Sequence, residues 1–265
     1  MNIYFKELKS NRKSIIIWSI CVFLMVASGM AKFDAYSKSG QNMTELLKDM
    51  PKSLRAVFGF NELDLSKVSG YFGVLFIYLL LMATIHATML GATVIAKEER
   101  DKTYEFLFTK PVSRSIIVTA KLLAAITNII IFNLVTMASS MMLLAKYSHG
   151  EAVNDEIARL MAAMFILQLL FMVIGSALAA VKKKSKKAAS LATGILVFTY
   201  FLSVAIDLND RLTGLKYFTP FKYFEAKNVM YGGGFAAVYV VISVVLIAAL
   251  TTVTYVFYKN RDLNV

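Results

Sequence analysis

The segment Lys97–Arg114, with the sequence KEERDKTYEFLFTKPVSR, decides the architecture of this chain of 265 residues. Nine of its eighteen residues are ionic, five basic and four acidic. Long apolar runs flank it, Tyr71–Ala96 and Ser115–Ala145, and they contain a single ionic residue between them, Lys121. A chain with this pattern leaves a lipid bilayer, exposes a compact charged element to water and enters the bilayer again. That arrangement suits a membrane subunit that receives force from a soluble partner.

The composition indicates a membrane protein along its whole length. Hydrophobic residues make up 58% and charged residues 17%, whereas a soluble domain carries about 25% charged residues. A membrane-spanning helix needs about 20 predominantly apolar residues. Runs near that length cover residues 15–31, 71–96, 115–145, 157–181, 188–206 and 235–257. Lys121 and Arg159 lie inside these runs near an end, and we expect both to extend their charges to the membrane surface. The predicted fold is an all-α membrane protein with six transmembrane helices, forming one domain over residues 1–265.

The charge distribution predicts the orientation of these spans. With six spans both termini share a side, and the segments on that side carry sixteen basic and six acidic residues. The segments on the other side carry twelve basic and eleven acidic residues. Basic residues favour the cytoplasmic side, so we expect both termini in the cytoplasm. The net charge of +12 then reflects orientation and needs no nucleic acid partner. Basic residues before the first run leave a cleaved signal peptide as an alternative.

Two connecting segments have a pattern of their own. Met1–Ser14 mixes apolar and basic residues and predicts an amphipathic helix at the membrane interface, with a frayed basic tail as the alternative. Between the fifth and sixth runs, Asp207–Gly234 contains KYFTPFKYF at Lys216–Phe224. Its proline breaks any helix, and irregular backbone at membrane depth must be buried in protein or line a wet cavity. We expect a re-entrant hairpin here; an aromatic belt at the interface is the alternative.

The spans contain few polar residues and several ridges of small ones. Ala83, Ala87 and Gly91 recur at four-residue intervals and allow another helix to approach closely. Polar groups inside a bilayer are costly, so each is a candidate for function. We expect a substrate path between two protomers, bordered by spans two and five and closed at its outer end by the hairpin. The residues expected to line it are Thr84, His86, Thr88, Asn128, Asn133, Phe218 and Phe221. Hydrogen bonding between helices is the alternative for the polar members of this set.

Several catalytic motifs are absent from the sequence. It has no G-x-x-x-x-G-K-[ST], H-E-x-x-H, C-x-x-C or G-x-S-x-G. Its two histidines cannot form a metal site without carboxylates, and no acidic residue lies inside a span. The last absence argues against an ion-coupled secondary transporter and against most intramembrane hydrolases. We therefore expect no catalytic residue, no metal and no cofactor on this chain.

Three stretches carry a resemblance to a known family. They are KEERDKTYEFLFTKPVSRSIIVTAKLL at Lys97–Leu123, MPKSLRAVFGFNELDLSKVSGYFGVLF at Met50–Phe76 and LKYFTPFKYF at Leu215–Phe224. In these the chain resembles the six-span permease subunits of type-2 ABC exporters, and the tail FYKNRDL at Phe257–Leu263 also fits. Lys102 departs from the pattern, because glycine is common before the threonine in that family.

The resemblance implies a dimeric permease, here expected to be a homodimer, in the cell membrane and in contact with lipid. Two copies of a separate cytoplasmic ABC ATPase would bind ATP and Mg²⁺. The segment 97–114 would form the coupling helix that docks on that ATPase. The residues expected at this contact are Glu98, Glu99, Arg100, Asp101, Thr103, Tyr104, Glu105 and Phe108. Mixed charge beside aromatic residues suits such an interface, whereas a solvated turn is the simpler alternative.

The expected function is ATP-driven export of a hydrophobic, peptidic or lipid-like substrate by alternating access. Two other classes remain open on the sequence alone. One is a membrane scaffold or immunity protein that uses an ATPase without transport. The other is a membrane-embedded enzyme that acts on lipids.

Overall fold

A computed structural model describes residues 3–38, 50–51, 53–55, 59–60, 63–101, 112–148, 153–182, 185–232 and 234–260. Regular structure in these ranges is entirely helical. The long helices are α1 (Ile3–Lys38), α4 (Val68–Arg100), α6 (Arg114–Ala145), α7 (Asn154–Val181), α8 (Ser185–Leu208) and α10 (Ala237–Lys259). All six are long and apolar enough to cross a membrane, which confirms the six-span prediction.

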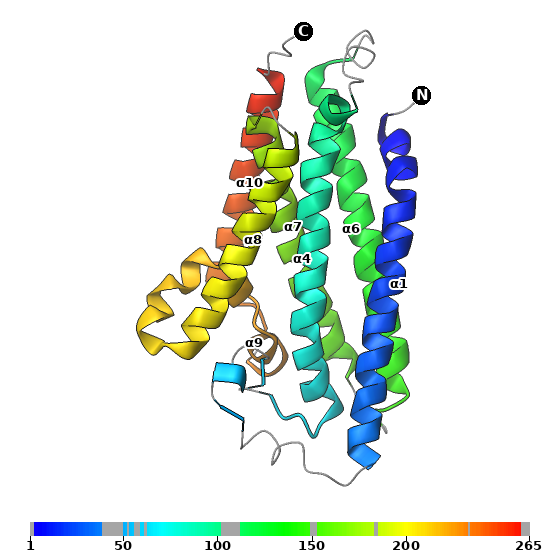
Figure 1. Ribbon diagram of the computed structural model, residues 1–265, viewed down its shortest axis with the longest axis vertical. Coiled ribbons are helices and arrows are strands. Elements are labelled where there is room, and N and C mark those ends of the chain that lie inside the picture. Colours follow the sequence, from blue (N-terminus) through cyan, green and yellow to red (C-terminus); the bar gives the residue numbers. More distant parts are fainter. Residues whose placement is uncertain are drawn as a thin grey trace.

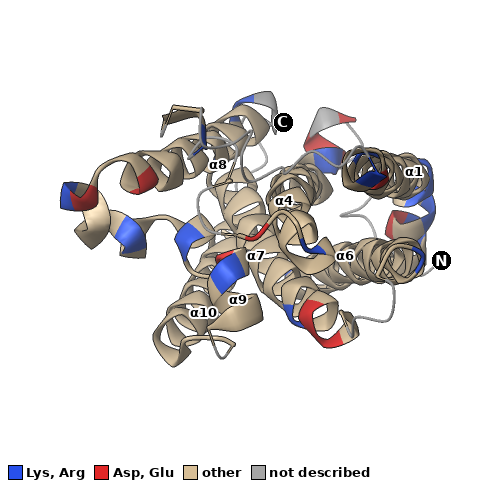
Figure 2. Cartoon of the chain, turned by 90° about the horizontal axis from the view of Figure 1, so that it is seen from below, with Lys and Arg blue, Asp and Glu red and all other residues tan. Residues whose placement is uncertain are grey.

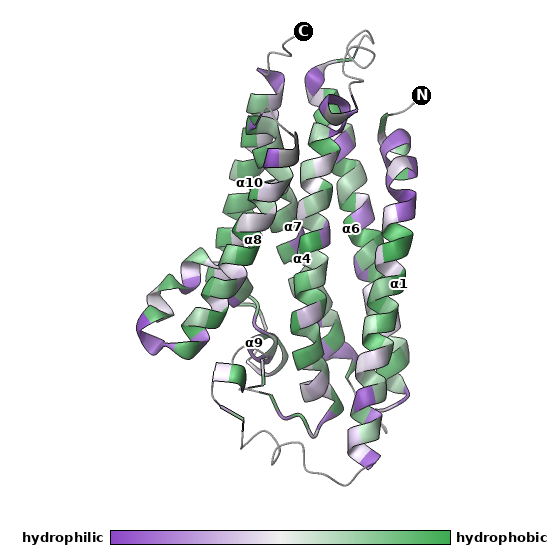
Figure 3. Ribbon diagram, in the orientation of Figure 1, coloured by the Kyte–Doolittle hydropathy of each residue, from purple (hydrophilic) through white to green (hydrophobic). Residues whose placement is uncertain are grey.

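The six helices run up and down between two ends of the molecule (Figure 1). One end, called the terminal end below, holds Ile3, Arg100, Arg114 and Lys259, so the first and last helices share it with both flanks of the charged segment. The opposite end, called the hairpin end, holds the connection from α8 to α10. Hydropathy follows this layout, because polar residues gather at the two ends and apolar residues fill the length between them (Figure 3).

The first helix differs from its prediction. α1 runs without a break from Ile3 to Lys38, whereas the sequence suggested a separate interfacial helix before a span at residues 15–31. The apolar run marks the part of a helix that matches the bilayer, but backbone hydrogen bonding continues into the polar flanks wherever no proline or glycine stops it. The other five spans begin and end within about three residues of the predicted limits, apart from the C-terminal end of α4 at Arg100.

Helices α4 and α7 form the centre of the bundle. Seen from the hairpin end, α7 lies among the other helices, with α1 at one edge and α8 and α10 toward the other (Figure 2). A Cβ added at Gly91 would lie 2.0 Å from the Met172 carbonyl oxygen, and one at Gly175 would lie 2.3 Å from that of Thr88. The small-residue ridge of span two is thus confirmed as a close helix contact. Larger residues here would force α4 and α7 apart.

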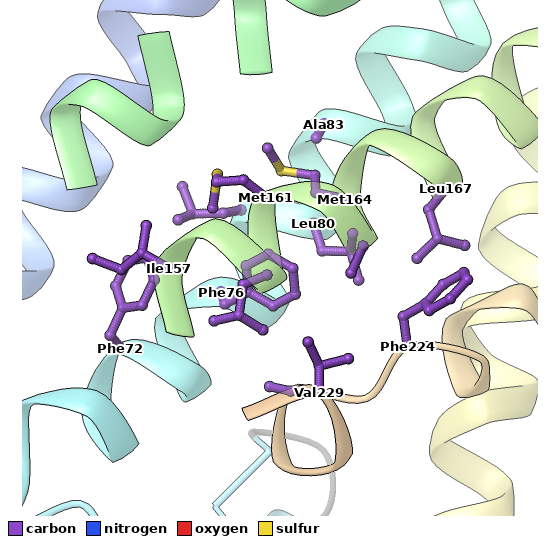
Figure 4. Close-up of a cluster of buried hydrophobic side chains, with 14 of the residues drawn as sticks. Phe72, Phe76, Leu80, Ala83, Ile157, Met161, Met164, Leu167, Phe224 and Val229 are labelled. Atoms are coloured by element: carbon purple, nitrogen blue, oxygen red, sulfur yellow. The ribbon is translucent and has the colours of Figure 1, made fainter. Parts of the chain in front are cut away.

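The main hydrophobic core fills the hairpin-end half of this contact. Phe72, Phe76 and Leu80 of α4 meet Ile157, Met161, Met164 and Leu167 of α7 (Figure 4). Phe224 and Val229, from the connection between α8 and α10, close the cluster from below. The connection is therefore packed onto the bundle through buried side chains.

That connection consists of three short helices. They are the 3₁₀ helices η1 (Asp210–Phe218) and η2 (Pro220–Lys222) and the α-helix α9 (Ala226–Tyr231). η1 has no buried residue and projects beside α8 (Figure 1), whereas η2 and α9 bury Pro220, Phe221, Val229 and Met230. Helical structure is interrupted between Phe218 and Pro220, as expected from the proline; a hairpin that re-enters the bilayer stays a prediction.

Candidate functional site

The terminal end of the bundle carries a set of polar contacts between helices that are distant in sequence. The first joins α4 to α1. Lys97 Nζ lies 3.1 Å from Glu7 Oε2 and donates a hydrogen bond to Ser10 Oγ at 2.7 Å. The side chain of Glu7 is only 2% exposed. A carboxylate buried to this degree is stable as an anion only beside a cation, so Lys97 holds the first turns of α1 against the end of α4.

The second contact joins α4 to α6. Lys121 Nζ forms an ion pair with Glu98 and donates a hydrogen bond to the Val94 carbonyl oxygen. Lys121 is fully buried. The expectation that its ammonium extends to the membrane surface is therefore wrong, because the carboxylate of Glu98 on α4 lies within reach inside the bundle. Arg159, in contrast, is exposed. The Glu98–Lys121 pair connects the two flanks of the charged segment.

Three further contacts complete this end of the molecule. Arg114 donates to the Lys259 carbonyl oxygen at 2.8 Å, and the hydroxyl groups of Thr119 and Tyr255 lie 2.7 Å apart, so α6 is joined to α10. The hydroxyl groups of Tyr4 and Thr127 lie 3.0 Å apart and join α1 to α6. We call all five contacts together the polar layer. It connects four of the six long helices beside the charged segment.

The predicted ATPase-contact residues fall into two groups. Thr103, Tyr104, Glu105 and Phe108 lie outside the described residues. Glu99 is half-buried and Asp101 exposed at the end of α4, and Arg100 is the last residue of that helix. Glu98 faces α6 instead, since its carboxylate pairs with Lys121. Contact with an ATPase stays a prediction for all eight residues.

The hydroxyl groups predicted to line a path are satisfied within α4. Thr84 donates to the Leu80 carbonyl oxygen at 2.9 Å and Thr88 to that of Thr84 at 2.7 Å. Both are fully buried. His86 is buried on another face, where its ring stacks 5.1 Å from that of Phe132 and lies 5.2 Å from that of Trp18. All three residues are buried in helix contacts, and a role in a path stays a prediction for each.

The two asparagines of α6 are also engaged. Asn128 donates to the Ala124 carbonyl oxygen at 2.7 Å. Asn133 reaches α7, where it donates to the Met161 carbonyl oxygen at 3.1 Å and to Gln168 Oε1 at 3.2 Å. The alternative interpretation, hydrogen bonding between helices, holds for Asn133. A role in a path stays a prediction for both.

The hairpin end has a second buried lysine. Lys222 of η2 forms ion pairs with Asp207 at the end of α8 and with Glu225 before α9. Burial lowers the pKa of Lys222, but the two carboxylates outweigh burial and keep its pKa above the usual 10.5. Asn228 Nδ2 also donates to Glu225, at 2.9 Å. These contacts fold the hairpin back onto α8.

A cavity of about 150 Å³ lies between α4, α8 and this hairpin. Phe76, Ile77 and Leu80 form its α4 wall, and Tyr200, Ser203 and Asp207 belong to its α8 wall. Phe221, from the predicted path, lines the cavity and is 8% exposed, whereas Phe218 lies on η1 and is 73% exposed. The cavity combines this apolar lining with the charges of Asp207, Lys222, Glu225 and Lys227.

Sequence reasoning missed the residues that organise both ends. Glu7, Lys97, Lys121 and Lys222 each form an ion pair, and none was among the predicted site residues. One signal was available for Lys121, since a lone lysine inside an apolar run requires a partner. Within the described ranges no group of three His, Cys, Asp or Glu side chains is placed to hold a metal ion.

Comparison with known proteins places the chain in context. The family model described as ABC-2 family transporter protein matches residues 1–263. No curated protein matches the chain significantly.

Proposed function

We propose that this chain, which belongs to the ABC-2 family of transporter proteins, is the permease of an exporter with separate ATPase subunits. Membership makes it the multi-pass membrane subunit of an ABC transporter, and transport by this family requires an ATPase partner. We further propose the direction of transport, the site where the ATPase docks, the substrate path, the assembly of the permease and its orientation in the membrane. Two ATPase copies dock on a homodimer of this chain, which lies in the cell membrane with both termini in the cytoplasm.

The polar layer is the observation that carries the docking proposal. A loop that receives force moves a transmembrane bundle only where its flanks are fixed to that bundle. Lys97, Glu98 and Arg114, at the two flanks of the charged segment, each contact another long helix. The surplus of basic residues at this end supports a cytoplasmic position, where an ATPase has access.

The cavity between α4 and α8 supports the proposed path. The aromatic and aliphatic residues that line it favour an apolar group of the cargo, and the charges at the hairpin favour a polar group on the same cargo molecule. An amphipathic cargo that is peptidic or lipid-like fits both features. Binding of ATP would change the packing of α4 against α8 and so open or close this cavity, as alternating access requires.

Affinity purification of the chain from its native host, followed by mass spectrometry and an ATP hydrolysis assay, tests the proposal. We expect an ATPase subunit in equal amount, and weaker capture when Glu99 and Asp101 are both changed to alanine. The matched control changes Asp34 and Asp210 at the hairpin end, which should leave capture intact. A chain that purifies without any ATPase would contradict the proposal and favour a lipid-modifying enzyme. An ATPase that binds without flux into reconstituted vesicles would favour a scaffold or immunity protein.

A further inference from the structure

Two of the consecutive charged residues in the last turn of α4 point to two different helices. Lys97 pairs with Glu7 on α1, and Glu98 pairs with Lys121 on α6. The polarity of the two pairs is opposite, since α1 supplies an acid and α6 supplies a base. Consecutive residues of a helix are separated by about 100° around its axis, so a single turn reaches both neighbours.

The partners of these charges are the more deeply buried members of each pair. Side-chain exposure is 2% for Glu7 and 0% for Lys121, against 19% for Lys97 and 12% for Glu98. A buried ion that loses its partner is strongly unfavourable. Movement of the α4 end away from α1 or α6 would leave Glu7 or Lys121 in that condition, so each pair resists separation.

The opposite polarity also fixes the rotation of α4. If α4 turned by one residue position, Lys97 would face Lys121 or Glu98 would face Glu7. Either rotation replaces an attraction by a repulsion between like charges in a poorly solvated site. The hydroxyl pair of Tyr4 and Thr127 closes the triangle by joining α1 directly to α6.

We infer that Lys97 and Glu98 form a two-armed link, which makes α1, α4 and α6 move as one unit when the segment 97–114 is displaced. This inference rests on the proposed function and assigns Glu98 to positioning rather than to ATPase contact. From Arg100 to Phe76, α4 spans roughly 36 Å at 1.5 Å per residue. The same helix that is clamped at the terminal end therefore forms a wall of the cavity at the hairpin end.

The test uses the permease–ATPase complex in lipid nanodiscs and follows the cavity directly. Ser203 lines the cavity, and Ser203→Cys in a Cys21→Ser background gives it one thiol. The readouts are ATPase capture, ATP hydrolysis and the rate of thiol labelling by a water-soluble maleimide, with and without ATP and vanadate. We expect the labelling rate to respond to nucleotide in the otherwise unchanged chain.

Substitutions break each arm separately. Lys97→Glu should keep ATPase capture and hydrolysis but lose the nucleotide response of labelling, and the double variant Glu7→Lys/Lys97→Glu should regain it. This arm exchanges cleanly because Ser10 can donate to a carboxylate as well as accept from an ammonium. Glu98→Gln breaks the other arm without inverting charge. The control exchanges Asp34 and Lys38, an exposed pair on α1, and should change none of the readouts.

The outcomes separate the link from the function on which it rests. An unmodified chain that captures no ATPase overturns both. An unmodified complex that captures ATPase but labels at the same rate in both nucleotide states overturns the link and the proposed opening of the cavity, while ATPase docking stands. A Lys97→Glu or Glu98→Gln variant that keeps the nucleotide response also overturns the link. A melting temperature recorded for each variant identifies misfolding, and the charge exchange of Glu7 and Lys97 distinguishes positioning from a general loss of stability.

Discussion

Lys121 and Lys222 are buried lysines at opposite ends of the same bundle, and their surroundings differ. Lys121 has no exposed surface, and its partner Glu98 is 12% exposed. Lys222 is 9% exposed, but its partners Asp207 and Glu225 are 38% and 29% exposed. The first pair joins two transmembrane helices, whereas Lys222 joins η2 to the end of α8 and to the turn before α9. Solvent can therefore compensate for a lost charge at the hairpin end but not at the terminal end.

The largest effect should follow from Lys121→Met, which leaves the Glu98 carboxylate without a cation. Loss of one partner of a buried pair destabilises a protein by about 3–5 kcal/mol. The free energy of unfolding in mixed detergent micelles, followed by fluorescence of Trp18, measures this change. The double variant Glu98→Gln/Lys121→Met should regain most of the stability, because no buried ion remains unpaired. Equal destabilisation of the single and double variants would show that packing, rather than charge, dominates at this site.

A smaller effect is expected from Lys222→Met. Two partly hydrated carboxylates replace their lost ion pairs by contacts with water, so we expect a loss of about 1–2 kcal/mol. The loss should be local, visible as faster hydrogen exchange in residues 219–231 with little change in α4 and α7. If exchange accelerates across the whole bundle, the hairpin contributes to global stability and the contrast between the two ends fails.

Alkaline pH should also destabilise the hairpin, but by less than Lys222→Met does. The pKa of Lys222 lies above 10.5 in the folded protein, so its stabilising contribution is complete below pH 10.5 and decreases as pH rises through the folded pKa. The melting temperature of the unmodified chain should therefore fall more steeply than that of Lys222→Met between about pH 10 and pH 12. Parallel curves for the two proteins would contradict the assignment.

No measurable change is expected from Lys38→Met. Lys38 pairs with Asp34 one helical turn away, and its side chain is 74% exposed. Exposed ion pairs contribute little because water screens them. The melting temperature of this variant sets the baseline of the series. A shift as large as that of Lys222→Met would mean that burial does not govern the strength of these pairs.

The sequence predicts the spans well because each one is a local property. The limits of an apolar run follow from the residue types alone, so α6 begins and ends within one residue of its predicted limits. The small residues around Gly91 and Gly175 likewise predict close packing by their size alone. The continuity of α1 was not predicted, because the apolar run is shorter than the helix at both ends.

The ion pairs could not be derived in the same way. Glu98 and Lys121 are separated by 23 positions, and nothing in a single sequence states which anion a buried cation meets. The aromatic residues of the hairpin pose a similar problem, since the sequence does not indicate which of Phe218 and Phe221 is buried. Packing separates them, because Pro220 directs Phe221 toward Phe171 and Tyr200 while η1 leaves Phe218 exposed.

Burial of Lys121 also bears on how the chain enters a membrane during synthesis. A lone lysine opposes insertion of its helix, by up to about 3 kcal/mol when it lies at the bilayer centre. α6 emerges after α4, so Glu98 is already present when Lys121 arrives. The two helices thus insert most favourably as a hairpin whose charges neutralise each other. The ion pair therefore favours insertion of α4 and α6 together over separate release of each helix into lipid.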